Sequence, residues 1–174
     1  LGGDLTGSGS VSMSKDGALN LNGHILDNDV SLTGDAAIGG GTLNGSLSVD
    51  CDQKLTLNGN LAGSGTVTLG GCATLDLGGH TLDNAVILKD SVIIGGGRLN
   101  GALSVASGQT LTLCGNLSGS DAVSLADWAI LDLSGHTLDK TVALEGSAVI
   151  SGGALDSALS VGDERVLGII GDLS

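Results

Sequence analysis

The chain has 174 residues and a formal net charge of −13, with 32 glycines, one tryptophan and no proline, phenylalanine or tyrosine. A conventional globular core normally contains aromatic side chains, so this composition favours an interior of stacked aliphatic residues. The few basic residues exclude the clustered Lys and Arg that nucleic-acid binding requires. No apolar run approaches the ~20 residues of a membrane span.

One phrase of nine residues occurs three times, at 19–27, 75–83 and 131–139, and each copy begins 56 residues after the previous one. The phrase reads Leu-Asp-Leu-Gly-Gly-His-Thr-Leu-Asp in its middle copy. A fixed period of this kind is typical of repeat architectures, in which each unit buries its apolar face only against its neighbours. We therefore divide the chain into units 4–59, 60–115 and 116–171 within one domain, 1–174.

Each unit divides again at its glycines into pieces of 20, 18 and 18 residues, which in the middle unit are 60–79, 80–97 and 98–115. Apolar residues two apart, as in Val67-Thr68-Leu69, recur in every piece. This is the period of a strand with one buried face. The sequence therefore predicts an all-β fold, a single-stranded parallel β-helix (β-solenoid) of nine rungs, with a height of ~43 Å at ~4.8 Å per rung.

The aligned pieces predict four inward columns of branched aliphatic side chains. In the middle unit these columns are Leu61, Leu82 and Leu99; Val67, Val86 and Leu103; Leu69, Leu88 and Val105; and Leu75, Ile94 and Leu111. The first rung of each unit is two residues longer at a Gly-rich corner such as 63–65, where glycine tolerates positive φ.

The phrases at 75–82 and 60–69 resemble the rungs of right-handed parallel β-helix proteins, above all the passenger regions of bacterial autotransporters and filamentous adhesins. The resemblance runs along the whole chain. It implies a secreted or surface-displayed bacterial protein, although enzymes and adhesins share such rungs. Natural solenoids carry capping elements at their ends, and neither end of this sequence has the pattern of a cap.

The histidines of the repeated phrase, His24, His80 and His136, are the obvious candidates for a metal or acid-base site. They recur three rungs apart, however, which is ~14 Å at ~4.8 Å per rung and too far for a shared metal. We interpret them as turn residues. For Asp76 we expect Gly95 and Thr112 at the matching positions of the next rungs, so no second carboxylate accompanies it as glycoside cleavage would require. The sequence thus predicts no catalytic residue, no metal ligand and no cofactor.

Trp128 is the only ring that could stack on a ligand, and it falls in a turn between Leu125 and Leu131. Ice binding would require regular ranks of outward Thr, and the outward column that contains Thr68 and Ile87 is too mixed. Cys51 and Cys72 fall in the same corner of consecutive rungs. A disulfide between them is one alternative and two free thiols the other, because rungs ~4.8 Å apart bring Cα atoms within the range that a disulfide needs. Cys114 lies at another corner and is expected to stay free.

Residues 169–174 are in phase with residues 1–6, so the last residues of the sequence begin a new unit. An uncovered rung exposes unpaired backbone groups that can accept another chain. We therefore expect head-to-tail stacking of copies or a covalent continuation of the solenoid, the latter because the sequence begins with Leu and reads as a processed protein or a segment of a longer one.

The functional expectation is an extracellular or cell-surface structural and adhesive β-solenoid, a rigid spacer or self-associating shaft without enzymatic activity. Its expected partners are further copies of itself and host or cell-surface glycans or proteins. Two alternatives stay open at this point: a filament subunit that stacks head to tail, and a fragment of a polysaccharide-processing β-helix enzyme.

Overall fold

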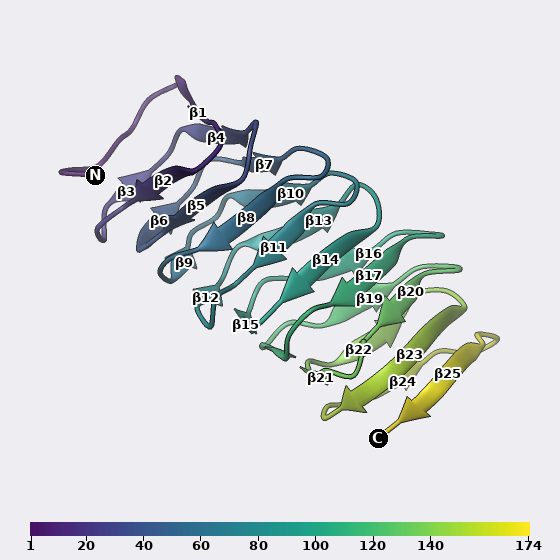
Figure 1. The fold of residues 1–174 in the computed structure, drawn as a ribbon. Helices are drawn as coiled ribbons and strands as arrows, with labels where there is room; N and C mark the ends of the chain where they lie inside the picture. Colours follow the sequence, from purple (N-terminus) through teal and green to yellow (C-terminus); the bar gives the residue numbers. More distant parts are fainter.

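The computed structural model describes residues 1–174 as a stack of coils built from 25 β-strands, with no helix. Successive coils lie one on the next from the N-terminus to the C-terminus, and the two termini lie at opposite ends of the stack (Figure 1). The sequence forms strands because inward Leu, Val and Ile alternate with small polar residues, a pattern that suits a half-buried pleated surface. The predicted β-solenoid is confirmed.

The coils form three faces, which we call the first, second and third. The first face is a nine-stranded sheet of β1 (Ser10–Met13), β4 (Asp29–Leu32), β7 (Leu47–Val49), β10 (Thr66–Leu69), β13 (Ala85–Leu88), β16 (Leu103–Val105), β19 (Val123–Leu125), β22 (Val142–Leu144) and β24 (Leu159–Val161). The second face contains β2 (Gly17–Asn20), β5 (Ala36–Gly39), β8 (Lys54–Leu57), β11 (Thr74–Asp76), β14 (Val92–Gly95), β17 (Thr110–Leu113), β20 (Ile130–Asp132), β23 (Ala148–Leu155) and β25 (Leu167–Leu173).

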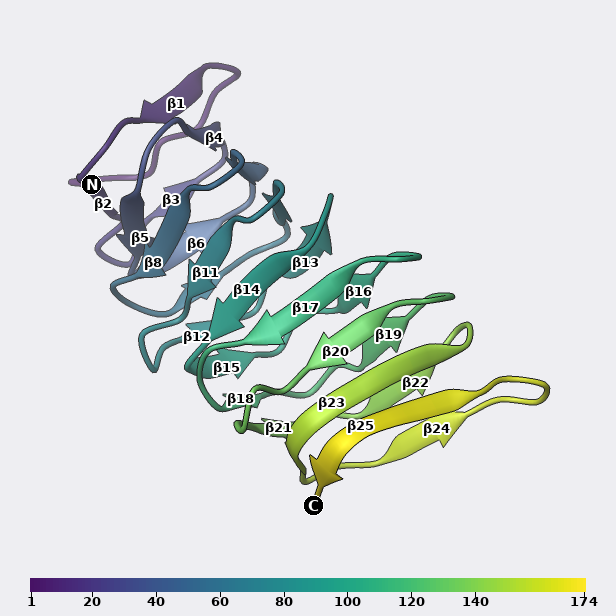
Figure 2. The ribbon, with the colours of Figure 1, turned by 45° about the vertical axis from the view of Figure 1, so that its right-hand side comes forward.

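The third face has shorter strands: β3 (Ile25–Leu26), β6 (Gly41–Leu43), β9 (Leu61–Ala62), β12 (Thr81–Leu82), β15 (Gly97–Leu99), β18 (Leu117–Ser118) and β21 (Thr137–Asp139). The long strand β23 pairs with both β20 and β21, so it turns the corner and joins the second and third faces into one sheet. Every strand pairs in parallel with the equivalent strand of the next coil, and Figure 2 shows these ladders along the stack.

The interior is a single cluster of 39 buried apolar side chains that runs along the stack. It contains Leu, Val, Ile, Ala and one Met, and no aromatic ring. All twelve residues of the four predicted inward columns are buried. Three of the columns also have the predicted register, as in the pairing of Leu61 with Leu82 and of Leu82 with Leu99.

The fourth column is wrong in its last member. Leu75 pairs with Ile94 as expected, but Ile94 then pairs with Leu113, whereas Leu111 pairs with Val92. In the third coil of the middle repeat, the second-face strand β17 is therefore shifted by two residues relative to the prediction. A shift of two keeps every side chain on its own side of the sheet, because strand side chains alternate with a period of two, so all these residues are still buried.

Candidate functional sites on the outer surface

The three histidines end tight turns at the corner between the second and third faces. In the middle repeat His80 N–H donates to Leu77 C=O at 2.8 Å, and the two residues between them, Gly78 and Gly79, have φ of 57° and 79°. Positive φ at both central positions is the signature of a type I′ turn. The Asp76 carboxylate accepts a hydrogen bond from Gly78 N–H at 3.0 Å and so holds the approach to the turn.

The other copies build the same turn from different residues. Before His24 the central residues are Asn22 and Gly23, and before His136 they are Ser134 and Gly135, all with positive φ. The interpretation of the histidines as turn residues is confirmed. No group of three or more His, Cys, Asp and Glu side chains in the chain could hold a metal ion. The repeated phrase is therefore explained by backbone geometry.

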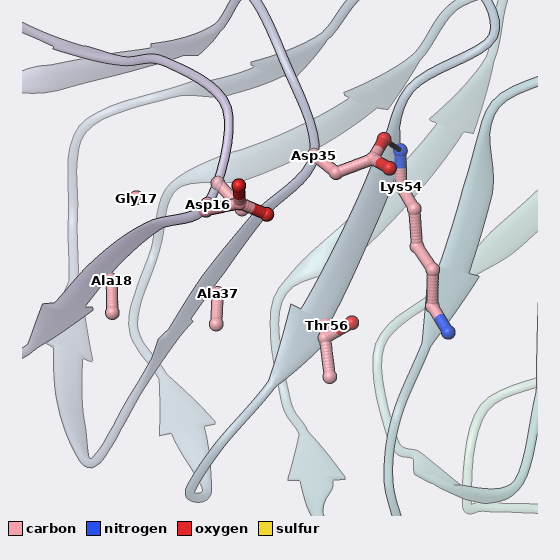
Figure 3. A pocket seen from close by; sticks show the side chains of 8 residues that line it. Asp16, Gly17, Ala18, Asp35, Ala37, Lys54 and Thr56 are labelled. Atoms are coloured by element: carbon pink, nitrogen blue, oxygen red, sulfur yellow. Dashed lines mark hydrogen bonds between the residues drawn. The ribbon is translucent and has the colours of Figure 1, made fainter.

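A shallow trough of about 280 Å³ crosses the second face near the N-terminal end. Its floor is made of Ala18, Ala37 and Thr56, which pair in register on β2, β5 and β8 and lie side by side in Figure 3. Asp35 lies at its margin, where its carboxylate accepts a hydrogen bond from Lys54 N–H at 2.8 Å. The small floor residues leave this part of the face open.

The Lys54 side chain leads away from Asp35 and forms an ion pair with Asp76 of the next coil, with Nζ 2.7 Å from Oδ2. The hydrogen bond with Asp76 raises the pKa of Lys54, and the same bond lowers the pKa of Asp76. Lys54 is thus held as an ammonium at neutral pH and cannot act there as a general base. The ion pair is a cross-coil contact between two charges that neutralise each other.

The expected neighbours of Asp76 need a correction. Gly95 is opposite Asp76 as predicted, but Thr112 lies opposite Ile93 instead of Gly95, and the two-residue shift brings Cys114 to the position beside Gly95. The charged neighbour of Asp76 is Lys54, which lies in the preceding coil and was not predicted from the sequence. The sequence signal for this contact was Lys54 itself, a basic residue two positions before Thr56, which pairs with Asp76.

Trp128 lies at an exposed turn beside an apolar groove of about 460 Å³ on the last coils of the second face. The groove is lined by Trp128, Ile130, Ser147, Ala148, Val149, Val166 and Gly168. Ile130, Val149 and Gly168 form one outward column, and the missing side chain of Gly168 hollows it. The indole is 76% exposed and its residue has a φ of 61°, a conformation that bulky residues rarely adopt.

All three cysteines are free and exposed. Cys72 has positive φ like Asp52, and both donate an N–H bond to the next coil at the same turn position, so Cys72 corresponds to Asp52. Cys51 therefore lies beside Gly71 rather than in one column with Cys72. The disulfide between Cys51 and Cys72 stays a prediction, which a thiol count under denaturing, non-reducing conditions tests.

Lys140 is a buried cation that sequence reasoning missed. Position 140 corresponds to Asn28 and Asn84 in the other repeats. Asn84 Nδ2 donates to Leu43 C=O at 3.0 Å and to Gly65 C=O at 2.9 Å, which ties its corner to the two preceding coils. Alignment of the repeats would have revealed the exchange of Asn for Lys, but not that this position is inside.

The Lys140 ammonium makes a similar link, donating to Leu99 C=O at 2.5 Å and to Gly101 C=O at 3.5 Å. No carboxylate forms an ion pair with it, and its side chain is 1% exposed. Burial lowers the pKa of Lys140 to about 8, while the more distant Asp121 charge acts in the opposite direction. Lys140 therefore links its corner to carbonyl groups of an earlier coil, and this link requires a charge to be buried.

These features define the class of the protein as a parallel β-solenoid with a wholly aliphatic interior. No family model, curated protein or solved structure matches the chain. None of its secondary-structure elements is a helix of the length and apolar character needed to cross a membrane.

Proposed function

We propose that this protein is a structural and adhesive β-solenoid that works outside the cell as a rigid, self-associating shaft, without enzymatic activity. The continuous core supports the rigid part of this proposal, because each coil packs on the next and the stack has no hinge of unpaired coils. A rigid stack of this kind keeps a group attached to one end at a fixed distance from the other end.

Self-association is supported by one observation: positions that are buried inside the stack are open at its ends. Val105 and Leu113 are each 1% exposed, whereas their equivalents in the last coil, Val161 and Ile169, are 44% and 54% exposed. At the other end Leu5 is 42% exposed. These side chains belong to the inward columns, and a coil of a second copy, or of a continuation of the same solenoid, would cover them.

The coil that fits best over each end is the opposite end of a second copy. Each end combines open backbone groups with apolar side chains that continue the internal ladder, and parallel pairing satisfies both at once. Because the contacting surfaces differ, the contact is head to tail and can repeat to give a filament.

Sedimentation velocity over a range of concentrations tests the self-association. We expect the wild-type chain to form species that grow with concentration, and Ile169→Lys to abolish them by placing a charge in the joint. Ile87→Lys is the matched control, because Ile87 is an exposed outward residue in the middle of the stack. A wild-type chain that stays monomeric at the highest concentrations would overturn the proposal.

The adhesive part of the proposal is supported by the exposed Trp128 ring beside its apolar groove. Aromatic rings stack on the apolar faces of sugars and on apolar side chains of protein partners. Because Trp128 is the only tryptophan, its fluorescence reports on this site alone. We expect cell-surface glycans to shift the emission of Trp128 and to protect it from acrylamide quenching. If the emission is unchanged with every glycan and host surface protein tried, Trp128 has no part in adhesion.

A further inference from the structure

The apolar groove beside Trp128 lies on the outer surface of three neighbouring strands. β20, β23 and β25 lie side by side on the second face (Figure 2), and their outward column of Ile130, Val149 and Gly168 lines the groove. Trp128 and Ser147 line it at the turns that precede β20 and β23. Because these side chains face outward, the stacking of further coils would leave the groove open.

Trp128 occupies a turn position that a bulky side chain does not favour. The equivalent turn residues of other coils, which also have positive φ, include Asp16, Asp52, Gly108 and Glu164, and these are small or polar. A tryptophan in this conformation is strained, and strain of this kind persists mainly where function requires it. The ring is exposed, so packing in the interior does not explain it. Trp128 therefore indicates a contact with another molecule.

The groove offers apolar surface and few hydrogen-bonding groups. Its volume of about 460 Å³ lies within the roughly 300–1,000 Å³ of ligand sites. Ser147 is the only polar side chain of the lining, and its Oγ already accepts a hydrogen bond from Val166 N–H at 3.0 Å. A sugar in the groove would lose water from its hydroxyl groups and gain few partners, which is unfavourable. An apolar side chain needs no such partner, so the groove suits a protein segment, while a glycan can still stack on the exposed ring.

The turns beside the groove are acidic. In the coils of β20, β23 and β25 they contain four carboxylates, Asp127, Glu145, Asp163 and Glu164, and one basic residue, Arg165. Arg165 is directed to its own chain, with Nη1 3.8 Å from Glu145 Oε2. The net charge of −13 has the same sign. This field repels anionic partners, such as sulfated glycans, and attracts cationic ones.

The spread of these carboxylates favours a chain with several positive charges. They belong to coils up to two steps apart, which is about 10 Å at ~4.8 Å per step. A single cationic group cannot contact carboxylates so far apart. A peptide segment can, because basic residues on either side of an apolar residue are separated by a similar distance.

We propose that this groove binds a basic segment of a partner protein, which places an apolar side chain beside Trp128 and its Lys or Arg side chains against the carboxylates of the neighbouring turns. This inference rests on the proposed adhesive role of Trp128. It adds a defined class of protein partner to the glycans considered for the exposed ring.

Fluorescence titration with three short peptides tests the inference. The probe is Lys-Leu-Lys-Leu-Lys, and its matched controls are Lys-Ser-Lys-Ser-Lys, which lacks the apolar side chains, and Glu-Leu-Glu-Leu-Glu, which reverses the charge. Trp128 is the only tryptophan, so its emission reports on the groove. We expect the probe to bind at least about tenfold more tightly than either control, since burial of one leucine side chain is worth roughly tenfold or more. Added salt should weaken its binding by screening the carboxylates.

Gly168→Val tests the groove itself. A Cβ at position 168 would lie 3.3 Å from Val149 Cγ2, so a valine needs only a small shift of Val149 and fills the hollow. We expect this variant to bind the probe at least about tenfold more weakly than the wild-type chain. Ala143→Val is the matched control, because it places a valine on the outer surface of the first face.

Glu164→Gln tests the charge. This variant should weaken binding of the probe, whereas Asp156→Asn, which removes an exposed carboxylate at another corner, should not. Circular dichroism checks that each variant is folded.

The outcomes separate this inference from the proposed function. If the probe binds no more tightly than either control peptide, or if Gly168→Val or Glu164→Gln binds it as the wild-type chain does, the basic-segment inference is wrong. Glycans that shift the emission of Trp128 would then leave the adhesive role standing. If neither peptides, glycans nor surface proteins change this emission, both proposals for Trp128 are overturned.

Discussion

Replacing Lys140 with asparagine should stabilise the protein. Lys140 places an ammonium group with no ion-pair partner at a corner where the middle repeat has Asn84. An asparagine at position 140 would meet Leu99 C=O and Asp121 C=O, the equivalents of the two carbonyls that Asn84 binds. The substitution therefore keeps the link between coils and removes the buried charge.

The expected gain follows from the pKa of Lys140, which burial lowers from 10.5 to about 8. The difference of about 2.5 pKa units corresponds to at most about 3 kcal/mol at ~1.4 kcal/mol per unit. Between these two pKa values the unfolded chain binds more protons than the folded chain, so the stability of the wild type rises as the pH rises through this window. The cost of the charge is fully present below about pH 8.

Urea unfolding followed by circular dichroism measures the effect. At about pH 7 we expect Lys140→Asn to raise the free energy of unfolding by roughly 1 to 3 kcal/mol, and this gain to shrink as the pH approaches about 10.5. Lys89→Asn is the matched control, because it removes the same charge from an exposed corner. Equal stability of wild type and Lys140→Asn at about pH 7, with parallel pH profiles, would refute the argument.

Three further predictions concern the core, the ion pair and the turns. Leu88→Asp should abolish cooperative unfolding, because Leu88 is 4% exposed and an unpaired carboxylate there costs several kcal/mol, whereas Thr68→Ser on the outer surface should not move the thermal midpoint. Equal midpoints for these two variants would show that Leu88 faces outward. Lys54 lowers the pKa of Asp76 from 3.8, so the wild type should lose a small stabilisation as the pH falls below that value, and Asp76→Asn should not. Identical acid profiles in urea titrations would contradict this. Ser134→Gly should raise the thermal midpoint, because Ser134 has a φ of 48° and a left-handed residue with a side chain costs roughly 1 kcal/mol. A lower midpoint would mean that the Ser134 side chain stabilises its turn.

The sequence alone was enough to predict the β-solenoid and which residues face inward. Both depend on periods that can be counted along the chain: the 56-residue repeat and the alternation of residues such as Val67, Thr68 and Leu69. The turn role of the histidines followed from their spacing as well. Some of these properties are local to one coil, and the others recur in the same way in every unit. Neither kind requires knowledge of which residues meet between neighbouring coils.

The tertiary structure alone decided the register of the second-face strands and the side-chain contacts between coils. A strand can slide by two residues without turning any side chain to the other face, so the alternating pattern could not reveal that Ile94 pairs with Leu113. The ion pair of Lys54 with Asp76 depends on the pairing of two other strands, β8 and β11, which belong to different coils. The burial of Lys140 depends on the stacking of coils, because its ammonium reaches carbonyl groups 39 and 41 residues earlier in the chain, and only that stacking brings them close.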